Sequence, residues 1–587
     1  MQYGSKRFRY IQCAKILYFA IVIAVLGSDV AAQAQKNGGR EQTYCNPMDL
    51  AYRFQLDQPS RREAADPTLV VYHNEYWLFP SKSGGYWHSK DLLHWSFVQA
   101  SGYNTEDYAP TALVYRDKLY LTAGHRKLYT TKNPLGGKWT EAADFGASFG
   151  DADLFLDDDG KVYMYSGVSD KEPLHIAELD PKHGFKVLRS VDVPASYYFK
   201  DRGWETPGDF NQIGNKRPYV EGSWMTKHDG KYYLQYAAPG TQFRTYGDGV
   251  LVANNPMGPF TYAPNSPFSF KPTGYVTGAG HSSTIAGLDG HFWHVASMTI
   301  GVRHMFERRL GLFPTWFTAD GELVTDTYLG DYPHFVGGDR GLTGWMLLSR
   351  KKPVFASSSM EQHGPESAVD EDIKTWWSAK TGNPDEWFKV DLGRPKTIQA
   401  VQINFADEGS TTLGRSTEVY RYVLETSDDD SHWKTIVDRS KVGRDAPHDY
   451  EVLPKARTAR FIRIRNAYSP NGANFSISDL RVFGNGGGKP PVAAEGLQAA
   501  LDPSDARHAT VKWQSSASAE FYIVRLGSSP TILSQNYQVY DGATSLDVRS
   551  LNSGVAYYVA VDAVNENGIS RGSEVIRLAG GTGSLGR

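Results

Sequence analysis

Cysteine is almost absent from this chain: its 587 residues include only Cys13 and Cys45. Cys13 lies in an N-terminal segment with the features of an export signal, so removal of that segment would leave one cysteine. A single cysteine cannot form an internal disulfide, which excludes a small disulfide-stabilised scaffold. The stability of the mature protein must therefore come from the packing of its cores.

Long hydrophobic runs are also scarce, and the one at the N-terminus is short. A basic stretch with Lys6, Arg7, Arg9 and Lys15 precedes an apolar run over residues 16–26, and small residues follow at 32–34. This order predicts a signal peptide over residues 1–34 and a periplasmic or extracellular location in a bacterium. The run is shorter than a typical membrane span, so we expect no span after cleavage, with an uncleaved anchor as the alternative.

The chain has no marked excess of charge, since 62 Lys and Arg face 65 Asp and Glu for a net charge of -3. It therefore has no electrostatic footprint for nucleic acid or for an anionic membrane. Apolar residues with helical periodicity over three turns are missing from residues 46–336. The 58 Gly, 35 Tyr and 14 Trp favour an all-β protein, and the length predicts several domains.

The sequence does contain one repeated motif. A polar head, a short apolar run, a turn and a second strand rich in aromatics recur, with heads at Asp66, Glu106-Asp107, Asp151, Glu221 and His281. A hairpin that cannot bury its own face must pack against its copies. The spacing of the heads matches four-stranded blades with insertions, so the sequence predicts a five-bladed β-propeller over residues 46–336.

The heads of the units differ in chemistry. The first strand of each blade lines the axis of a propeller, so Asp66, Asp151 and Glu221 would converge there with His281. Hydrolysis of a glycosidic bond needs one carboxylic acid to protonate the leaving oxygen and one carboxylate to activate water or attack directly. A third charge nearby helps to separate the two pKa values. The pattern therefore predicts a catalytic centre at the axis.

Each head taken alone also has a structural explanation. Asp66 could open an Asp-Pro turn, and Asp151 could belong to a solvated or calcium-binding loop. Glu221 could be a charge at a strand end, and His281 could be a hydrogen-bonded core residue. The five heads in register, rather than any single one, favour the catalytic interpretation.

In motif order, residues 46–336 resemble glycoside hydrolase family 43. The matching stretches are Ala65-Asp66-Pro67, Tyr108-Ala109-Pro110, Asp151-Ala152-Asp153, Val220-Glu221-Gly222, Gly280-His281-Ser282 and Arg308 or Arg309. The resemblance implies that Asp66 is the general base, Asp151 a pKa modulator and Glu221 the general acid. It also implies substrate contacts for His281 and Arg308, and no cofactor for catalysis. Two departures from the family pattern are Asp153, in place of a small residue, and Ser223, in place of proline.

The function implied by this resemblance is that of a secreted inverting glycoside hydrolase. It would remove β-D-xylosyl or α-L-arabinofuranosyl residues from plant or algal polysaccharides or oligosaccharides. The alternatives are a β-galactan-active glycosidase of the same family and a non-catalytic glycan-binding propeller. The presence of all three carboxylates argues against the non-catalytic alternative. The sequence indicates no particular oligomeric state.

Residues 341–484 resemble the discoidin domain of coagulation factors V and VIII, which is grouped with carbohydrate-binding module family 32. The matching stretches include residues 368–372, 387–393, 460–464 and 479–484. The resemblance implies a carbohydrate-binding β-sandwich and a structural Ca²⁺ near Asp370, Asp372, Thr375 and Asp479, whose oxygen ligands suit that ion. A loop without metal is the alternative.

The sequence after residue 484 predicts a linker and a third domain. Residues 485–491 (NGGGKPP) form a linker rich in Gly and Pro. Residues 492–580 resemble a fibronectin type III module, on the basis of Trp513, Tyr522, Leu551 and Tyr557. The sequence therefore predicts a second β-sandwich that acts as a spacer or docking element.

Overall fold

The computed structural model describes residues 42–123, 126–337, 341–572 and 574–578. The predicted signal peptide at 1–34 lies outside these residues. Strands dominate, and no helix in the described ranges is long and apolar enough to cross a membrane. The described helical segments are short 3-10 turns: η1 (Pro134–Gly136), η2 (Pro194–Tyr197), η3 (Gly203–Glu205) and η4 (Pro365–Ala368).

Five antiparallel sheets of four strands follow one another along the chain. The first contains β2 (Thr68–Tyr72), β3 (Glu75–Phe79), β4 (Gly85–Ser89) and β5 (Ser96–Gln99). The second contains β6 (Thr111–Val114), β7 (Leu119–Ala123), β8 (Lys127–Thr131) and β9 (Thr140–Asp144). The third contains β10 (Asp153–Leu156), β11 (Val162–Ser166), β12 (Leu174–Asp180) and β13 (Lys186–Val193).

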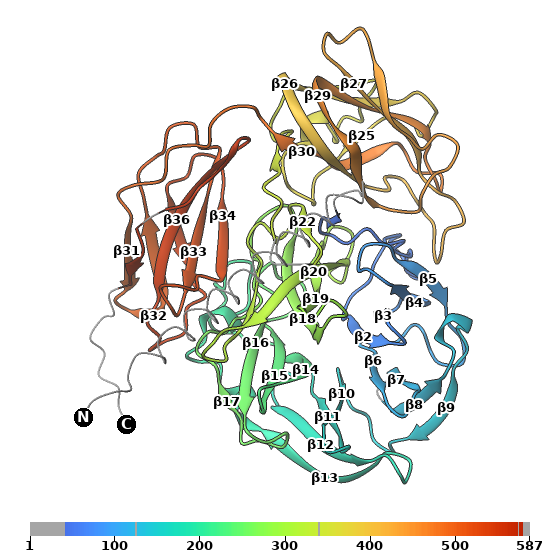
Figure 1. Ribbon diagram of the computed structural model, residues 1–587, viewed down its shortest axis with the longest axis vertical. Coiled ribbons are helices and arrows are strands. Elements are labelled where there is room, and N and C mark those ends of the chain that lie inside the picture. The colour runs from blue at the N-terminus through green and yellow to red at the C-terminus, as the bar shows by residue number, and fades with distance from the viewer. Residues whose placement is uncertain (1–41, 124–125, 338–340, 573, 579–587) are drawn as a thin grey trace, which may run out of the picture. The chain divides into compact units, whose positions relative to one another are not determined.

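The last two sheets have longer inner strands. The fourth contains β14 (Glu221–His228), β15 (Lys231–Ala238), β16 (Gly247–Ala253) and β17 (Thr261–Tyr262). The fifth contains β18 (Thr277–Ala286), β19 (Phe292–Thr299), β20 (Arg308–Phe317) and β21 (Leu323–Thr325). Figure 1 shows the five sheets arranged radially, with β2, β6, β10, β14 and β18 innermost. The predicted five-bladed propeller is confirmed.

Hydrogen bonds link each inner strand to the next and close the ring. In order around the axis they are Thr68 Oγ1 to Pro110 O (2.8 Å), Leu154 N to Thr111 Oγ1 (3.2 Å), Met225 N to Asp153 Oδ2 (2.8 Å), Trp224 Nε1 to Thr284 O (2.9 Å) and Leu69 N to Ser283 Oγ (2.9 Å). Because β2 is bonded to both β6 and β18, the heads of all five units are held around one point.

Asp153, one of the two departures from the family pattern, bridges three blades. It begins β10, and its carboxylate accepts hydrogen bonds from Met225 N in the fourth blade and from Thr111 Oγ1 in the second (3.4 Å). The side chain is buried, and burial raises its pKa to about 7. Asp153 therefore fastens blades around the axis, where a small residue could not.

Short strands near the two ends of the propeller pair with each other. β1 (Thr43–Tyr44) is antiparallel to β22 (His334–Phe335). Asn46 Nδ2 donates to Leu312 O (2.9 Å) and Gly330 O (2.7 Å), which ties the entering chain to the fifth blade.

The discoidin-like region forms one eight-stranded sheet system around its own core. Its order is β23-β30-β26-β29-β27-β28, with β24 beside β26 and β25 beside β30. The strands are β23 (Met346–Leu347), β24 (Val354–Ala356), β25 (Trp377–Ser378), β26 (Trp387–Phe405), β27 (Arg421–Ser427), β28 (Lys434–Asp438), β29 (His448–Tyr468) and β30 (Ser476–Asn485). Buried ion pairs join it to the propeller, such as Arg62 Nε to Asp407 Oδ2 at 2.9 Å.

The last region is built from two sheets. One contains β31 (Gln498–Asp502), β32 (Asp505–Lys512) and β35 (Ser545–Val548). The other contains β33 (Phe521–Gly527), β34 (Gln535–Val539), β36 (Tyr558–Asn565), β37 (Gly568–Ser570) and β38 (Ile576–Arg577). Their buried apolar residues form one cluster with Trp204 and Tyr236 of the propeller.

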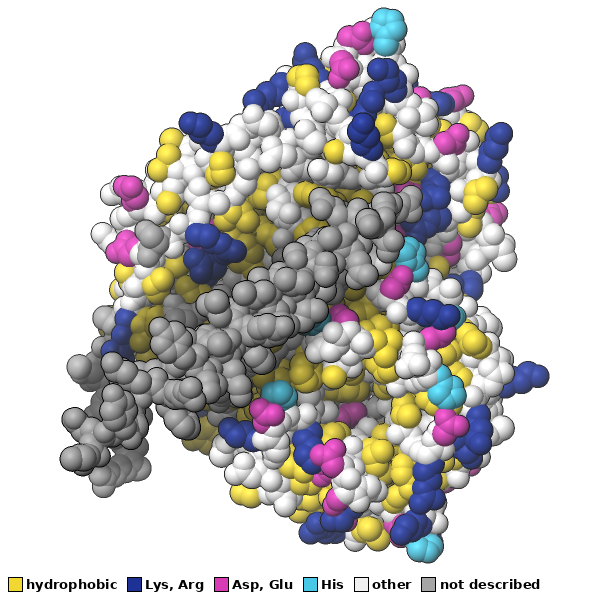
Figure 2. All heavy atoms as spheres, viewed as in Figure 1, with side chains coloured by type: hydrophobic (Ala, Val, Ile, Leu, Met, Phe, Trp, Pro, Cys, Tyr) yellow, Lys and Arg dark blue, Asp and Glu magenta, His cyan; other side chains and the backbone are white. Residues whose placement is uncertain are grey.

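The molecular surface carries charge of both signs. On the face visible in Figure 2, Lys and Arg side chains are interspersed with Asp and Glu. This distribution agrees with the nearly neutral net charge.

Candidate functional site

The heads of the five units share one backbone conformation. The residue with positive φ in each head is Asp66 (φ 51°), Ala109 (46°), Asp151 (46°), Gly222 (64°) and His281 (46°). Non-glycine residues adopt this left-handed conformation at a cost, so the surroundings must hold it in place. The repeat seen in the sequence is therefore also a repeat in backbone geometry, and it lies next to the inner strands at the axis.

Asp66 is buried among donors. Its carboxylate accepts hydrogen bonds from Arg308 Nη1 (2.8 Å) and Ser81 Oγ (2.6 Å), and its N–H donates to Ser297 Oγ (2.8 Å). Burial alone would raise its pKa, but the charges of Arg308 and His281 and the hydroxyl donors outweigh burial and hold the pKa below the ordinary value. Asp66 is thus an ionised carboxylate over most of the pH range.

Glu221, at the start of β14, has a different environment. One hydroxyl, that of Tyr246, donates to its Oε1 at 2.6 Å. Burial raises the pKa of Glu221, and the charge of Asp66 adds to the rise, against the opposing effects of His281, Tyr246 and Arg308. Glu221 therefore keeps a proton at a pH where Asp66 has lost its own.

Asp151 completes the cluster of carboxyl groups. Burial and the negative charges of Glu221 and Asp66 raise its pKa well above the ordinary value. His281 Nδ1 lies 3.8 Å from Asp151 Oδ2 and 3.4 Å from Asp66 Oδ1. The structure thus brings together Asp66, Asp151, Glu221 and His281, which lie far apart in the sequence.

Two neighbouring arginines point in different directions. Arg308 contacts Asp66 and also pairs with Glu63 Oε1 at 3.0 Å. Arg309 instead donates to His448 Nε2 of the discoidin-like region at 2.9 Å. Of the two arginines in the motif, Arg308 therefore belongs to the cluster.

The fourth and fifth units pack closely at the axis. A Cβ atom on Gly222 would lie 2.7 Å from His281 Cγ, and one on Gly280 would lie 2.9 Å from Tyr246 Cδ1. Glycine is required at 222 by this close approach, since non-glycine residues hold the same positive φ in the other four heads. The residue after Glu221 is thus fixed by its neighbours from the next blade.

The sequence did not reveal several groups in the cluster. Tyr246, Ser81, Ser297 and Glu63 lie outside the repeated heads. Tyr246 reaches Glu221 and Ser81 reaches Asp66 within one blade, whereas Ser297 of the fifth blade reaches Asp66 of the first. Asp248 was also missed: its Oδ1 accepts from the N–H of His281 at 2.9 Å. Ser81, Tyr246 and Ser297 lie in or after the second strands of their blades, so a blade-by-blade alignment of those stretches is the signal that could have suggested these three residues.

The predicted calcium ligands are only partly assembled. Thr375 Oγ1 donates to Asp370 Oδ2 (2.7 Å), whereas Asp479 Oδ2 accepts from Glu371 N (2.9 Å) and Asp372 is exposed. Burial raises the pKa of Asp370 to about 6 and that of Asp479 well above its ordinary value. No group of three or more His, Cys, Asp or Glu within the described ranges is arranged to hold a metal ion. The calcium site stays a prediction.

Two sequence profiles match this chain. The family described as glycosyl hydrolases family 43 matches residues 60–323, and the F5/8 type C domain matches residues 353–479. A solved structure described as a glycoside hydrolase is 19% identical, covers 74% of this chain and 99% of its own, and has a TM-score of 0.42. The chain therefore contains a glycosyl hydrolase family 43 domain and an F5/8 type C domain.

Curated relatives match the propeller at low identity. A beta-D-galactofuranosidase of Aspergillus niger is 24% identical over 270 residues, or 39% of this chain and 72% of the relative. A beta-xylosidase of Xylanibacter ruminicola is 29% identical over 172 residues, or 26% and 51%. A non-reducing end alpha-L-arabinofuranosidase of Bacteroides ovatus is 24% identical over 310 residues, or 45% and 53%. The chain thus spans about half the length of the last two relatives.

Proposed function

We propose that this chain, which contains a glycosyl hydrolase family 43 domain and an F5/8 type C domain, removes β-D-xylosyl or α-L-arabinofuranosyl residues from polysaccharides or oligosaccharides with inversion. The names of two relatives, a beta-xylosidase and an alpha-L-arabinofuranosidase, support this substrate class. The observation that carries the proposal is the assembly of the cluster, in which Arg308 and Ser81 donate to Asp66 while Tyr246 donates to Glu221. The pKa directions, downward at Asp66 and upward at Glu221, agree with this geometry.

In the proposed reaction, Asp66 is the general base and Glu221 the general acid. Asp66 takes a proton from water while the water oxygen forms a bond to the anomeric carbon. The bond from that carbon to the leaving oxygen breaks with its electron pair, and Glu221 gives its proton to that oxygen. Because water attacks from the side opposite the leaving group, the anomeric configuration inverts.

The neighbouring residues would prepare these two groups. Asp151 would act as the pKa modulator, since repulsion between its carboxylate and that of Glu221 favours a shared proton. Tyr246 would be a positioning residue that holds Oε1 of Glu221. His281 and Arg308 would contact the substrate, and Arg308 also keeps Asp66 ionised.

The two regions that follow the propeller would have different roles, one in binding the polysaccharide and the other as a spacer. The F5/8 type C domain would bind carbohydrate, and Asp370, Asp372, Thr375 and Asp479 would supply oxygen ligands to a structural Ca²⁺. Residues 492–580 would be a fibronectin type III-like spacer, for which the two-sheet order is suitable. The segment at 1–34 would direct the protein to the periplasm or the medium.

A panel of aryl glycosides tests the proposal. We expect turnover of the β-D-xyloside or the α-L-arabinofuranoside, and proton NMR should show the inverted anomer first. The relative named as a galactofuranosidase makes the β-D-galactofuranoside a necessary member of the panel, together with the β-D-galactopyranoside. Turnover of galactosides alone would favour the β-galactan alternative. No turnover of any glycoside would favour a non-catalytic binding protein.

A further inference from the structure

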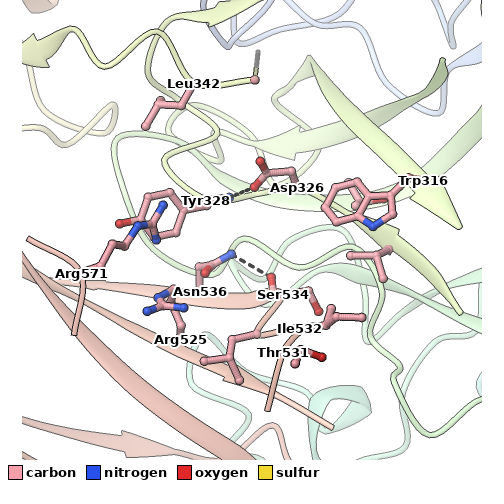
Figure 3. A pocket seen from close by; sticks show the side chains of 14 residues that line it. Trp316, Asp326, Tyr328, Leu342, Arg525, Thr531, Ile532, Ser534, Asn536 and Arg571 are labelled. Carbon is pink, nitrogen blue, oxygen red and sulfur yellow. Dashed lines mark hydrogen bonds between the residues drawn. The ribbon is translucent and has the colours of Figure 1, made fainter. Parts of the chain in front are cut away.

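A cavity of about 530 Å³ lies away from the axis, between the outer edge of the fifth blade and the last region of the chain. Its lining includes Trp316 on β20 and Asp326 and Tyr328 beyond β21. From the last region come Arg525, Asn536 and Arg571. Figure 3 shows Trp316 on one side of the open space and Arg571 beside Tyr328 on the other. The volume is typical of sites for small ligands.

Trp316 offers an aromatic platform in this cavity. The side chain is 42% exposed, although it occupies a strand position opposite Val324. Stacking on an indole face suits the C–H face of a sugar ring, because those hydrogens carry partial positive charge and the π face is negative. An exposed tryptophan inside a cavity therefore suits a carbohydrate.

The opposite wall is held by a buried carboxylate. Asp562, fully buried, accepts from Arg525 Nε and Nη2 (both 2.8 Å), from Arg571 Nη1 (2.8 Å) and from Tyr328 Oη (2.9 Å). Arg571 also stacks over Tyr328, with its Cζ 3.9 Å from the ring centroid. These contacts fix groups from both regions, so the wall is formed before any ligand arrives.

The charges of the cavity balance. Arg525 and Arg571 are matched by Asp562 and Asp326, so the site has no surplus positive charge for a phosphate or a uronate. The remaining N–H groups of the arginines can donate to sugar hydroxyls, and the Asp326 carboxylate can accept from them. Planar polar groups opposite an aromatic ring therefore favour a neutral sugar.

We propose that this cavity is a second glycan-binding site, which holds a neutral sugar residue of a polysaccharide away from the catalytic cluster. The proposal rests on the proposed function only for the choice of polysaccharide. Two sites on one chain increase the retention of a polymer without changing the turnover of a small glycoside.

Native gels that contain soluble arabinoxylan, arabinan, galactan or, as the charged comparison, polygalacturonate test the site. Trp316→Ala should weaken the retardation of the protein in the polymer that retards the wild type, by about tenfold or more in apparent dissociation constant. Trp316→Phe should retain part of the effect because it keeps a ring. Leu188→Ala, which removes an exposed apolar side chain from β13, is the matched control and should behave as wild type.

Aryl-glycoside turnover separates this proposal from the proposed function. Trp316→Ala should keep wild-type turnover, and its melting temperature reports folding. If Trp316→Ala misfolds, Arg571→Gln tests the same site, since Arg571 is exposed and should also weaken retardation. Wild-type retardation in these variants, or no retardation of the wild type by any of the polymers, would overturn the site. Retardation by polygalacturonate alone would overturn the neutral class. If the wild-type protein turns over no aryl glycoside, only the proposed function is overturned.

Discussion

The heads of the first and fourth blades hold equivalent positions but place their carboxyl groups in different surroundings. Asp66 receives a guanidinium and a serine hydroxyl, whereas Glu221 receives one tyrosine hydroxyl. Asp66 is buried and Glu221 is half-buried, and the pKa of Asp66 falls while that of Glu221 rises. The donors around each carboxyl group therefore separate the base from the acid at this axis, since a cation and a serine hydroxyl favour ionised Asp66.

The largest effect is expected from loss of the proposed acid. Glu221→Gln keeps the shape of the side chain but cannot donate a proton to a leaving oxygen. Turnover of a xylo- or arabino-oligosaccharide should fall by about 10²–10⁴-fold, as is typical for general acid catalysis. Initial rates of sugar release measure the loss. Wild-type rates with a folded variant would remove Glu221 from the role of acid.

Removal of the positive charge beside Asp66 should bring the pKa of Asp66 closer to that of Glu221. Arg308→Met takes away the cation that lowers the pKa of Asp66, so that pKa should rise. The acidic limb of the profile of kcat/KM against pH should then move to higher pH. Arg308→Lys, the charge-preserving control, should leave the limb closer to that of the wild type. An unmoved limb in Arg308→Met would show that Asp66 does not set it.

Removal of the Tyr246 hydroxyl, which donates to Glu221, should move the basic limb of the same profile. The Tyr246 hydroxyl stabilises the ionised carboxylate, so Tyr246→Phe should raise the pKa of Glu221 and shift the basic limb to higher pH. Tyr236→Phe is the matched control, because its hydroxyl bonds to Glu205 outside the cluster. A basic limb that moves equally in both variants would contradict a positioning role for Tyr246.

The smallest effect on chemistry, but a clear one on stability, is expected at Asp153. Its folded pKa of about 7 lies above the unfolded value of 3.8, so the folded state binds the proton more tightly. This stabilisation is complete below the unfolded pKa and is lost as the pH rises through the folded pKa, by at most about 4 kcal/mol. Asp153→Asn should lack this dependence. Urea unfolding of both proteins from pH 4 to pH 7 measures the difference, and parallel curves would contradict it.

The fold was largely predictable because its signals are local. Each blade has an apolar run, a turn dipeptide such as Asp159-Gly160 and a second strand, and five copies imply a ring. The heads were predictable because Asp66, Asp151 and His281 occupy the same place in their copies and Glu221 directly precedes the equivalent residue, Gly222. The position of each head in the repeat predicts its place at the axis, and the residue type gives its carboxyl or imidazole group.

The partners of these heads were not predictable in the same way. Tyr246, in the loop that precedes β16, donates to Glu221. Ser297 of the fifth blade accepts a hydrogen bond from Asp66 N of the first blade. The first contact depends on packing within the fourth blade and the second on how the ring closes, and no local pattern encodes either. The wall around Asp562 likewise depends on the docking of the last region, so the second cavity had no signal in the sequence.

The dependence of rate on leaving group tests the central claim most directly. A 4-nitrophenyl leaving group departs without protonation, whereas the alcohol of an oligosaccharide needs an acid. Glu221→Gln should therefore lose far more activity on the oligosaccharide than on the 4-nitrophenyl glycoside, while Asp66→Asn should lose comparable activity on both. Equal losses in Glu221→Gln, or a selective loss in Asp66→Asn, would contradict the assignment of acid and base.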